Sequence, residues 1–215
     1  MRKKIEILIF AVLGIVVVTL LGITFAYFFA ATSNSGNGIQ GQTLDFSASL
    51  ALTPIYRATN MVPLHNDLVT TAIGKANDKC IDKNGRDVCS LYHVTLSNTG
   101  ETVTLTPYIT TTSTTYTTTN LKCQLFSVTT SNGVTTYSEV SDILTISKTE
   151  NGKVYFTNGG NNITVNISNN ATQTFALVIW LMDTDNSQPE DYSRTFNGTI
   201  TFEGGNGQVY ADFTA

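Results

Sequence analysis

The sequence predicts an all-β protein: an antiparallel β-sandwich of the jelly-roll or immunoglobulin-like kind, preceded by an N-terminal hydrophobic helix. Charged residues make up only 13% of the chain, and the polar share comes from Thr, Ser and Asn, which suit a hydrated strand surface. Short stretches that alternate apolar and polar residues recur between Asn-Gly turns. The beginning of the chain is different, because it is continuously apolar.

Residues 1–31 are interpreted as a signal peptide or signal anchor. Met1-Arg2-Lys3-Lys4 is basic, and residues 7–31 carry no charge. A helix of about 25 residues, rising about 1.5 Å per residue, is long enough to cross a hydrocarbon core of about 30 Å. Because the basic residues precede the apolar run, the rest of the chain is expected outside the cytoplasm, at the cell surface or in the extracellular space.

Two fates of this segment remain open. The small-x-small triplet Thr24-Phe25-Ala26 predicts cleavage by signal peptidase between Ala26 and Tyr27. The apolar run is longer than an ordinary signal-peptide core, which favours retention as a membrane anchor. In either case residues 32–42 form a small polar linker, and residues 43–215 form the β-sandwich domain.

The alternation of residues 43–52, which begins with Thr43, Leu44, Asp45 and Phe46, predicts the first strand of this domain. Residues 67–76 are expected to form a short helix capped by Asn66, and the Thr-rich run 110–119 a loop or edge. The strand containing Trp180 is continuously apolar, so it is expected either to be central and buried on both faces or to belong to the sandwich core. Further strands are predicted at 91–97, 102–109, 122–129, 143–148, 153–157, 162–167, 174–182, 196–202 and 208–213.

Cys80 and Cys89 flank the dipeptide Asn84-Gly85 symmetrically. Asn-Gly favours a two-residue type I′ hairpin turn, which would set Cys80 directly opposite Cys89. A disulfide between them is therefore predicted, since export brings the chain into an oxidising space. Cys123 is left as a buried free thiol or as a partner for a bond between chains.

The same hairpin permits a second interpretation. Asp82, Asn84 and Asp87 place oxygen atoms around a Gly turn, as short calcium loops do, but the closing glutamate of an EF-hand is missing. The alternative is a hydrated hairpin tip in which neighbouring Lys83 and Arg86 offset the two Asp charges. No metal site is assigned from the sequence.

Motifs of the common enzyme classes are missing, so the protein is not expected to be an enzyme or to need a cofactor. Neither His65 nor His93 lies in a His-Glu-x-x-His motif, and the sequence contains no Gly-x-Ser-x-Gly elbow or P-loop. Four acidic residues follow the Trp180 strand and match either a glycosidase carboxylate pair or an ordinary polar loop; they are Asp183, Asp185, Glu190 and Asp191. A net charge of −4 argues against a nucleic-acid partner.

Two segments of the sequence resemble the TasA/camelysin family of Gram-positive biofilm-matrix and surface proteins. They are Gly22-Ile23-Thr24-Phe25-Ala26-Tyr27-Phe28 and Asn37-Gly38-Ile39-Gln40-Gly41-Gln42-Thr43-Leu44-Asp45-Phe46. The strand-turn run of residues 92–100 is also similar to the first sandwich strands of that family. Precursors of that family carry a similar junction, cut by a dedicated signal peptidase of the SipW type. The resemblance implies a jelly-roll-like domain that polymerises by donating its N-terminal strand to the next subunit.

The function expected from these observations is that of an exported structural protein of the cell surface or extracellular matrix. It would self-associate into fibres through the strand that begins at Thr43. The alternative is a membrane-anchored adhesin or binding module that does not polymerise and that contacts the membrane through residues 1–31. A pilin-like subunit lacks its processing motif around Glu6, and an exported hydrolase is the least favoured reading.

Overall fold

The structure is a computed structural model that describes residues 47–73, 79–205 and 207–215. The predicted signal segment, the linker and the residues Thr43–Phe46 lie outside this part of the chain. Within the described ranges, no helix is both long enough and apolar enough to cross a membrane.

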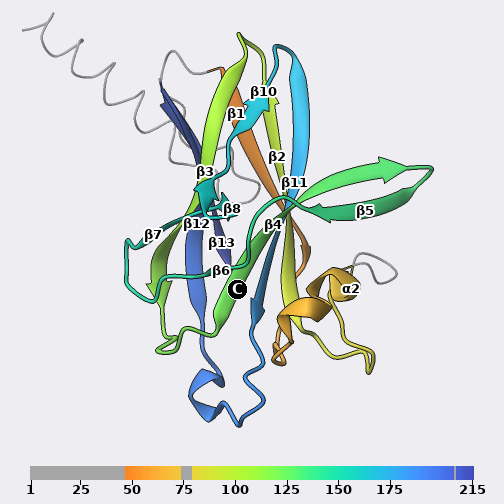
Figure 1. Ribbon diagram of the computed structural model, residues 1–215, viewed down its shortest axis with the longest axis vertical. Helices are drawn as coiled ribbons and strands as arrows, with labels where there is room; N and C mark the ends of the chain where they lie inside the picture. The colour runs from red at the N-terminus through yellow and green to blue at the C-terminus, as the bar shows by residue number, and fades with distance from the viewer. Residues whose placement is uncertain (1–46, 74–78, 206) are drawn as a thin grey trace, which may run out of the picture. The chain divides into compact units, whose positions relative to one another are not determined.

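The described residues form antiparallel β-sheets (Figure 1). One sheet has six strands, and its pairing order begins with β1 (Ala48–Tyr56), β2 (Cys89–Asn98) and β11 (Ala171–Leu181). β4 (Leu121–Ser131) and β5 (Val134–Glu139) complete that order, and β6 (Leu144–Thr145) pairs with β4. All these neighbours run antiparallel. The predicted antiparallel β architecture is therefore confirmed.

A second sheet has five strands. Its order is β10 (Val165–Ile167), β3 (Val103–Thr114), β12 (Phe196–Gly204) and β13 (Gly207–Thr214), and β7 (Lys153–Tyr155) also pairs with β3. β8 (Thr157–Asn158) and β9 (Asn161–Asn162) form a separate small hairpin. The helical elements are short: η1 (Asn66–Leu68), α2 (Val69–Ile73) and η3 (Pro189–Asp191).

The main core lies between the two large sheets, because inward-facing residues of both belong to one buried cluster. Leu96 and Leu177 contribute from the six-stranded sheet, and Ile109 and Phe202 contribute from the five-stranded sheet. Alternation along each strand directs these side chains inward while Thr and Ser face outward.

A second core covers the other face of β11. Successive strand residues point to opposite faces, so Ala176, Val178 and Trp180 face away from the main core. They pack with α2 and with the disulfide hairpin, and Trp180 is fully buried. The prediction that this strand is central and buried on both faces is confirmed, since β11 pairs with β2 on one side and β4 on the other.

Two expectations about local structure need correction, and one strand was missed. The Thr run does not form a loop throughout, because β3 continues to Thr114, and Thr111 is fully buried with its hydroxyl donating to the Ser147 carbonyl at 2.6 Å. β5 was not predicted. The side chain of Asn66 caps no helix: η1 begins there without a side-chain cap, and Asn66 Oδ1 accepts a bond from the indole of Trp180.

The disulfide between Cys80 and Cys89 is confirmed, with the two Cα atoms 5.4 Å apart. The predicted two-residue turn is wrong, since Ile81 pairs with Asp87 instead of Val88. Gly85 N–H donates to the Asp82 carbonyl at 3.2 Å, and Gly85 has a φ of 79°. This is a three-residue loop with a left-handed third residue. It forms because the Asp82 carboxylate accepts the backbone N–H groups of Asn84 and Arg86 at 2.8 and 2.9 Å.

Candidate functional site

The predicted assembly strand divides at Ser47 in the structure. Residues 48–52 belong to β1, which pairs with β2 of the same chain at the edge of the six-stranded sheet. Thr43, Leu44, Asp45 and Phe46 precede Ser47 and lie outside the described residues. A strand given to another subunit would therefore consist of residues before Ser47, and not of the whole 43–52 segment that the alternation predicts.

Asn98 fixes the point where the chain enters the domain. Its side chain is 1% exposed, and its Oδ1 accepts the hydroxyl of Ser47 at 2.6 Å. Its amide donates to the carbonyls of Glu101 at 2.6 Å and of Ile167 at 3.1 Å. Ile167 is the last residue of β10, so Asn98 joins Ser47 to the C-terminal end of that strand.

β10 leaves one edge without a strand partner among the described residues, since it pairs only with β3. A groove of about 400 Å³ lies beside it. Half-buried or buried apolar side chains line part of this groove, and exposed residues with polar side chains line the rest. The lining residues are Val140, Ile163, Thr164, Val165, Asn166, Gln173 and Phe175.

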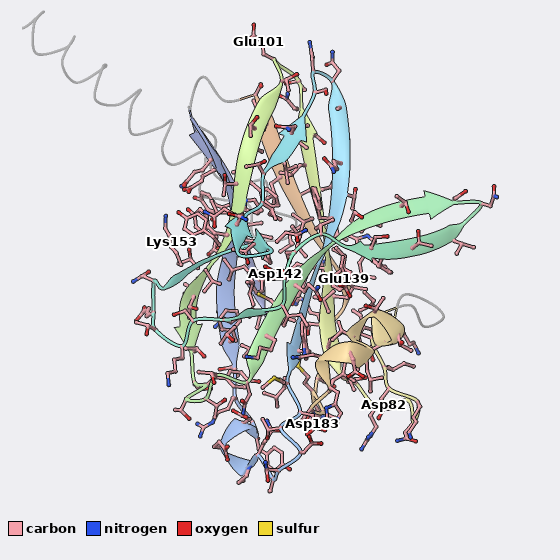
Figure 2. The ribbon with its side chains drawn as sticks, in the orientation of Figure 1. Asp82, Glu101, Glu139, Asp142, Lys153 and Asp183 are labelled. Carbon is pink, nitrogen blue, oxygen red and sulfur yellow. A yellow bond between two sulfur atoms is a disulfide. The ribbon has the colours of Figure 1, made fainter. Side chains whose placement is uncertain are left out.

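Asp142 fastens the β8–β9 hairpin, which lies close to the groove residue Val140. Its carboxylate accepts the hydroxyl of Thr157 at 2.9 Å and the backbone N–H groups of Gly159 and Gly160 at 3.1 and 3.2 Å. These bonds, the one from Gly160 first, lower the pKa of Asp142 because they favour its charged form. The β8–β9 hairpin is thereby fastened beside Val140, one of the groove residues (Figure 2 labels Asp142).

The residues of the calcium interpretation direct their carboxylates to different donors. Asp82 Oδ2 accepts Arg86 Nε at 2.8 Å and Nη2 at 2.6 Å, and bonds within the turn lower the pKa of Asp82, with the backbone N–H of Arg86 as the largest cause. Asp87 accepts the hydroxyl of Tyr56 and, at 3.3 Å, the backbone N–H of Thr59. Arg86 thus offsets the charge of Asp82, as the hairpin-tip alternative expects. Calcium binding at Asp82, Asn84 and Asp87 stays a prediction.

The four acidic residues after the Trp180 strand do not lie together, and Glu190 is exposed in η3. Asp191 is 3% exposed and accepts bonds from Thr118 at 2.5 Å, Asn120 at 2.8 Å and Gln188 at 3.2 Å. The hydrogen bonds of the Asp191 carboxylate therefore stabilise the η3 loop. These partners do not include the second carboxylate that glycoside hydrolysis requires. Asp183 and Asp185 lie instead beside His65. His65 is at least 118 positions away in the sequence, and the sequence patterns did not predict this contact.

In the described part of the chain, one cluster of three His, Cys, Asp or Glu side chains could hold a metal ion. It consists of His65, Asp183 and Asp185. The signal in the sequence is weak, because two acids in a polar loop and a distant His are common. Their contact depends on a parallel backbone bridge between Leu64 and Met182 that no periodicity predicts.

Comparison with known proteins leaves the family open. No protein-family model and no curated protein matches the chain. The chain is similar in structure to Spo0M, a sporulation control protein from Bacillus subtilis, with 7% identity and a TM-score of 0.31. That match covers 78% of this chain and 48% of Spo0M, so the chain spans about half the length of that protein.

A sugar phosphate isomerase of the cupin superfamily from Silicibacter pomeroyi gives 10% identity and a TM-score of 0.14 over 78% of this chain and 88% of that one. Similarities this weak bear on neither the fold nor the function of the chain. The resemblance to the TasA/camelysin family therefore depends on the sequence alone, chiefly on the motifs around Ala26 and Thr43.

Proposed function

We propose that the chain is an exported, non-enzymatic structural protein of the cell surface or extracellular matrix, related to the TasA/camelysin family, whose subunits join by strand donation. The observation that carries the proposal is the edge of β10, which has no strand partner among the described residues and lies beside a partly apolar groove. The N-terminal segment contains a short alternating sequence at residues 43–46. The pairing of β2 with β11 and of β3 with β10 supports a jelly-roll arrangement of the two sheets.

In this proposal the donated strand is centred on residues 43–46. An added strand gains backbone hydrogen bonds to the free edge, and its alternate side chains enter the groove. Leu44 and Phe46 lie two residues apart, so both face one side of an extended strand, and Thr43 and Asp45 face the other. The apolar pair would meet Ile163 and Phe175, and the polar pair would stay in water.

The length of the N-terminal segment is sufficient for this role. If cleavage follows Ala26, residues 27–46 precede the described domain, and an extended chain of about 20 residues reaches about 60 Å. Cleavage is therefore part of the proposal. N-terminal sequencing of the mature protein tests it directly: Tyr27 as the first residue supports a released subunit.

Electron microscopy and sedimentation of the purified mature protein test assembly. The donor variant Leu44→Ser/Phe46→Ser is expected to remain monomeric, and the matched control Thr43→Ser/Asp45→Ser, altered on the opposite side of the same strand, is expected to form fibres. The groove variant Ile163→Asp is also expected to remain monomeric. Because the donor variant keeps an intact groove and the groove variant keeps an intact strand, a mixture of the two should form heterodimers.

Two results would contradict strand donation. One is fibre formation by the donor variant to the same extent as by the unaltered protein. The other is a monomeric unaltered protein under every condition tested. A mature protein that begins at Met1 would favour the second candidate, a membrane-anchored adhesin or binding module, for which the unusual length of the apolar run 7–31 is the supporting observation.

A further inference from the structure

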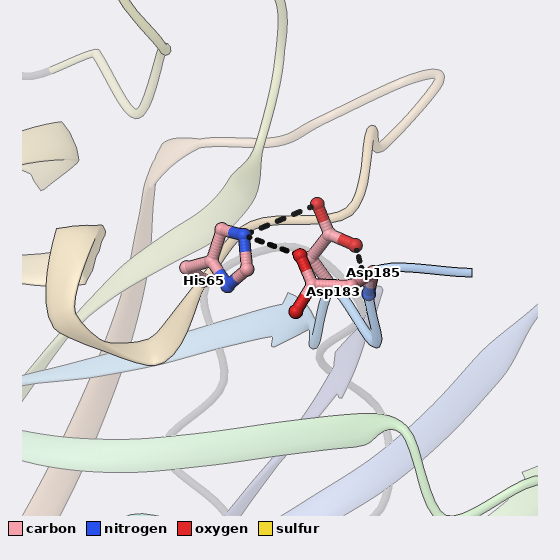
Figure 3. Close-up of side chains that lie close together, drawn as sticks. All are labelled: His65, Asp183 and Asp185. Atoms are coloured by element: carbon pink, nitrogen blue, oxygen red, sulfur yellow. Dashed lines mark hydrogen bonds and ion pairs between the residues drawn. The ribbon is translucent and has the colours of Figure 1, made fainter.

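A histidine and two aspartates from separate parts of the chain meet at one end of β11. Figure 3 shows the imidazole of His65 facing the carboxylates of Asp183 and Asp185. His65 Nε2 lies 3.3 Å from Asp185 Oδ1 and 3.7 Å from Asp183 Oδ2. One ligand atom from each of the three side chains lies within 4.8 Å of the others.

The backbone holds these side chains in register. Leu64 N–H donates to the Leu181 carbonyl at 2.8 Å, and Asp183 N–H donates to the Leu64 carbonyl at 3.0 Å. Leu64 and Met182 form a parallel bridge, and His65 and Asp183 are the residues that follow them in the sequence. Asp185 N–H donates to Asp183 Oδ1 at 2.9 Å, which ties the backbone of Asp185 to the Asp183 carboxylate. The backbones of His65 and Asp183 are consequently positioned by main-chain bonds, independently of the contact between their side chains.

No lysine or arginine forms an ion pair with the cluster within the described residues, where Asp183 and Asp185 pair with His65 alone. Two cations line the groove that contains His65 and Asp183. Arg86 is engaged by Asp82 at 2.6 Å, and Lys83 forms no ion pair with either carboxylate among the described residues. When the imidazole is neutral, as it must be to bind a metal, the two carboxylate charges lie together without a directly paired cation.

We propose that His65 Nε2 and the carboxylates of Asp183 and Asp185 bind a divalent transition-metal ion of the Zn²⁺ class. Ligand atoms about 2.0–2.2 Å from a tetrahedral Zn²⁺ lie about 3.3–3.5 Å from one another. The two distances from His65 Nε2 match this spacing to within a few tenths of an ångström. A mixed nitrogen and oxygen ligand set favours Zn²⁺ over Ca²⁺ and Mg²⁺, which prefer oxygen alone.

Three protein ligands leave a position of the ion for water or for another molecule. Solvent reaches the cluster, because the side chains of His65, Asp183 and Asp185 are 46%, 34% and 82% exposed. An adjoining groove of about 370 Å³ is lined by His65 and Asp183 and by apolar residues that include Leu68, Ala72 and Ile81. Figure 2 shows that Asp183 lies at the same end of the domain as the hairpin residue Asp82.

Isothermal titration calorimetry with Zn²⁺ and Ca²⁺ tests this site on the tag-free full chain, held in detergent. We expect one equivalent of Zn²⁺ to bind and Ca²⁺ to give no heat. His65→Ala and Asp185→Asn each remove one ligand and should weaken Zn²⁺ binding about tenfold or more. Glu190→Gln is the matched control, since it removes an exposed carboxylate from the same loop without touching the cluster, and it should bind as the unaltered chain does.

Absence of Zn²⁺ binding, or equal affinity in the His65→Ala and Asp185→Asn variants, would overturn the proposal. Thermal denaturation of each variant shows that it is folded, and both positions are exposed enough to tolerate the change. The measurement is made on the chain whether or not it assembles, so its outcome is independent of strand donation.

Discussion

The indole Nε1–H of Trp180 donates to Oδ1 of Asn66 at 3.0 Å across 114 residues of sequence. Trp180 is fully buried in the second core, and its N–H is a polar group that needs a partner there. Asn66 belongs to the first turn of η1, so this one bond joins the helical segment to the central strand β11.

Replacement of Asn66 by Ala should therefore destabilise the domain by about 1–3 kcal/mol, because the buried indole N–H loses its acceptor. Asn66→Asp retains an oxygen at this position and should cost less. Urea unfolding followed by Trp180 fluorescence measures both. The exposed neighbour Asp67 provides the control, and Asp67→Ala should stay within about 0.5 kcal/mol of the unaltered protein. An Asn66→Ala variant as stable as this control would contradict the role of the bond.

Loss of the Cys80–Cys89 disulfide should lower the free energy of unfolding by about 2–3 kcal/mol, the loop-entropy value for a closed loop of about ten residues. Both cysteines are fully buried in the second core, which also contains Trp180, so the disulfide anchors the hairpin in that core. The variant Cys80→Ala/Cys89→Ala should unfold at lower urea. Reductant should destabilise the unaltered protein and leave this variant unchanged; a variant that still responds to reductant would show that another disulfide is present.

Cys123 should behave as an inert thiol in the folded protein. It is fully buried in β4 and unpaired in the structure, and burial raises the pKa of its thiol far above the ordinary value. Because the thiolate is the reactive form, maleimide at pH 8 should not label Cys123 until guanidinium unfolds the chain. Mass spectrometry of labelled peptides measures this. Rapid labelling of the native protein, or a Cys123 dimer on non-reducing gels, would contradict it.

The buried amide of Asn98 should be worth about 2–3 kcal/mol, because its removal leaves several backbone groups without their partner. Asn98→Ala breaks the bonds that join Ser47, Glu101 and Ile167, which belong to three different chain segments. Urea midpoints compare it with Ser97→Ala, whose hydroxyl faces outward and bonds only Thr172. Equal midpoints for the two variants would show that Asn98 does not hold this end of the domain.

The bond between Tyr56 and Asp87 should give the protein a pH-dependent stability at high pH. The pKa of Tyr56 is raised to about 12. The hydrogen bond to Asp87 is the largest cause, followed by burial and by the negative charge of Asp87. A folded-state pKa above the unfolded value means that the contribution is complete below pH 10 and is lost as the pH rises from 10 to 12.

The difference in unfolding free energy between the unaltered protein and Tyr56→Phe should accordingly be constant from pH 7 to 9 and decline above pH 10. Denaturant unfolding at each pH measures it. Tyr192→Phe is the control, because Tyr192 is 65% exposed and its variant should follow the unaltered protein throughout. A Tyr56→Phe difference that persists unchanged at pH 12 would contradict this account.

Two Asn-Gly pairs show where local sequence is sufficient and where it fails. At Asn132-Gly133 both residues have positive φ, 51° and 77°, and Ser131 pairs with Val134, which is the two-residue turn that Asn-Gly favours. At Asn84-Gly85 the preceding Asp82 accepts backbone N–H groups with its side chain and enlarges the loop by one residue. The same dipeptide thus gives different registers, because a neighbouring carboxylate competes with the intrinsic preference of the turn.

The sequence by itself determined the antiparallel β class, the pairing of Cys80 with Cys89 and the two-sided burial of the Trp180 strand. These features follow from alternation, local loop closure and a continuous apolar run, all of which act between residues near in sequence. Only the tertiary structure decided that Asn66 serves Trp180 instead of a helix end, that the groove lies beside β10, and that His65 meets Asp183 and Asp185. Each of these depends on backbone pairing between distant segments, such as Leu64 with Met182, and sequence periodicity carries no information about which distant strands become neighbours.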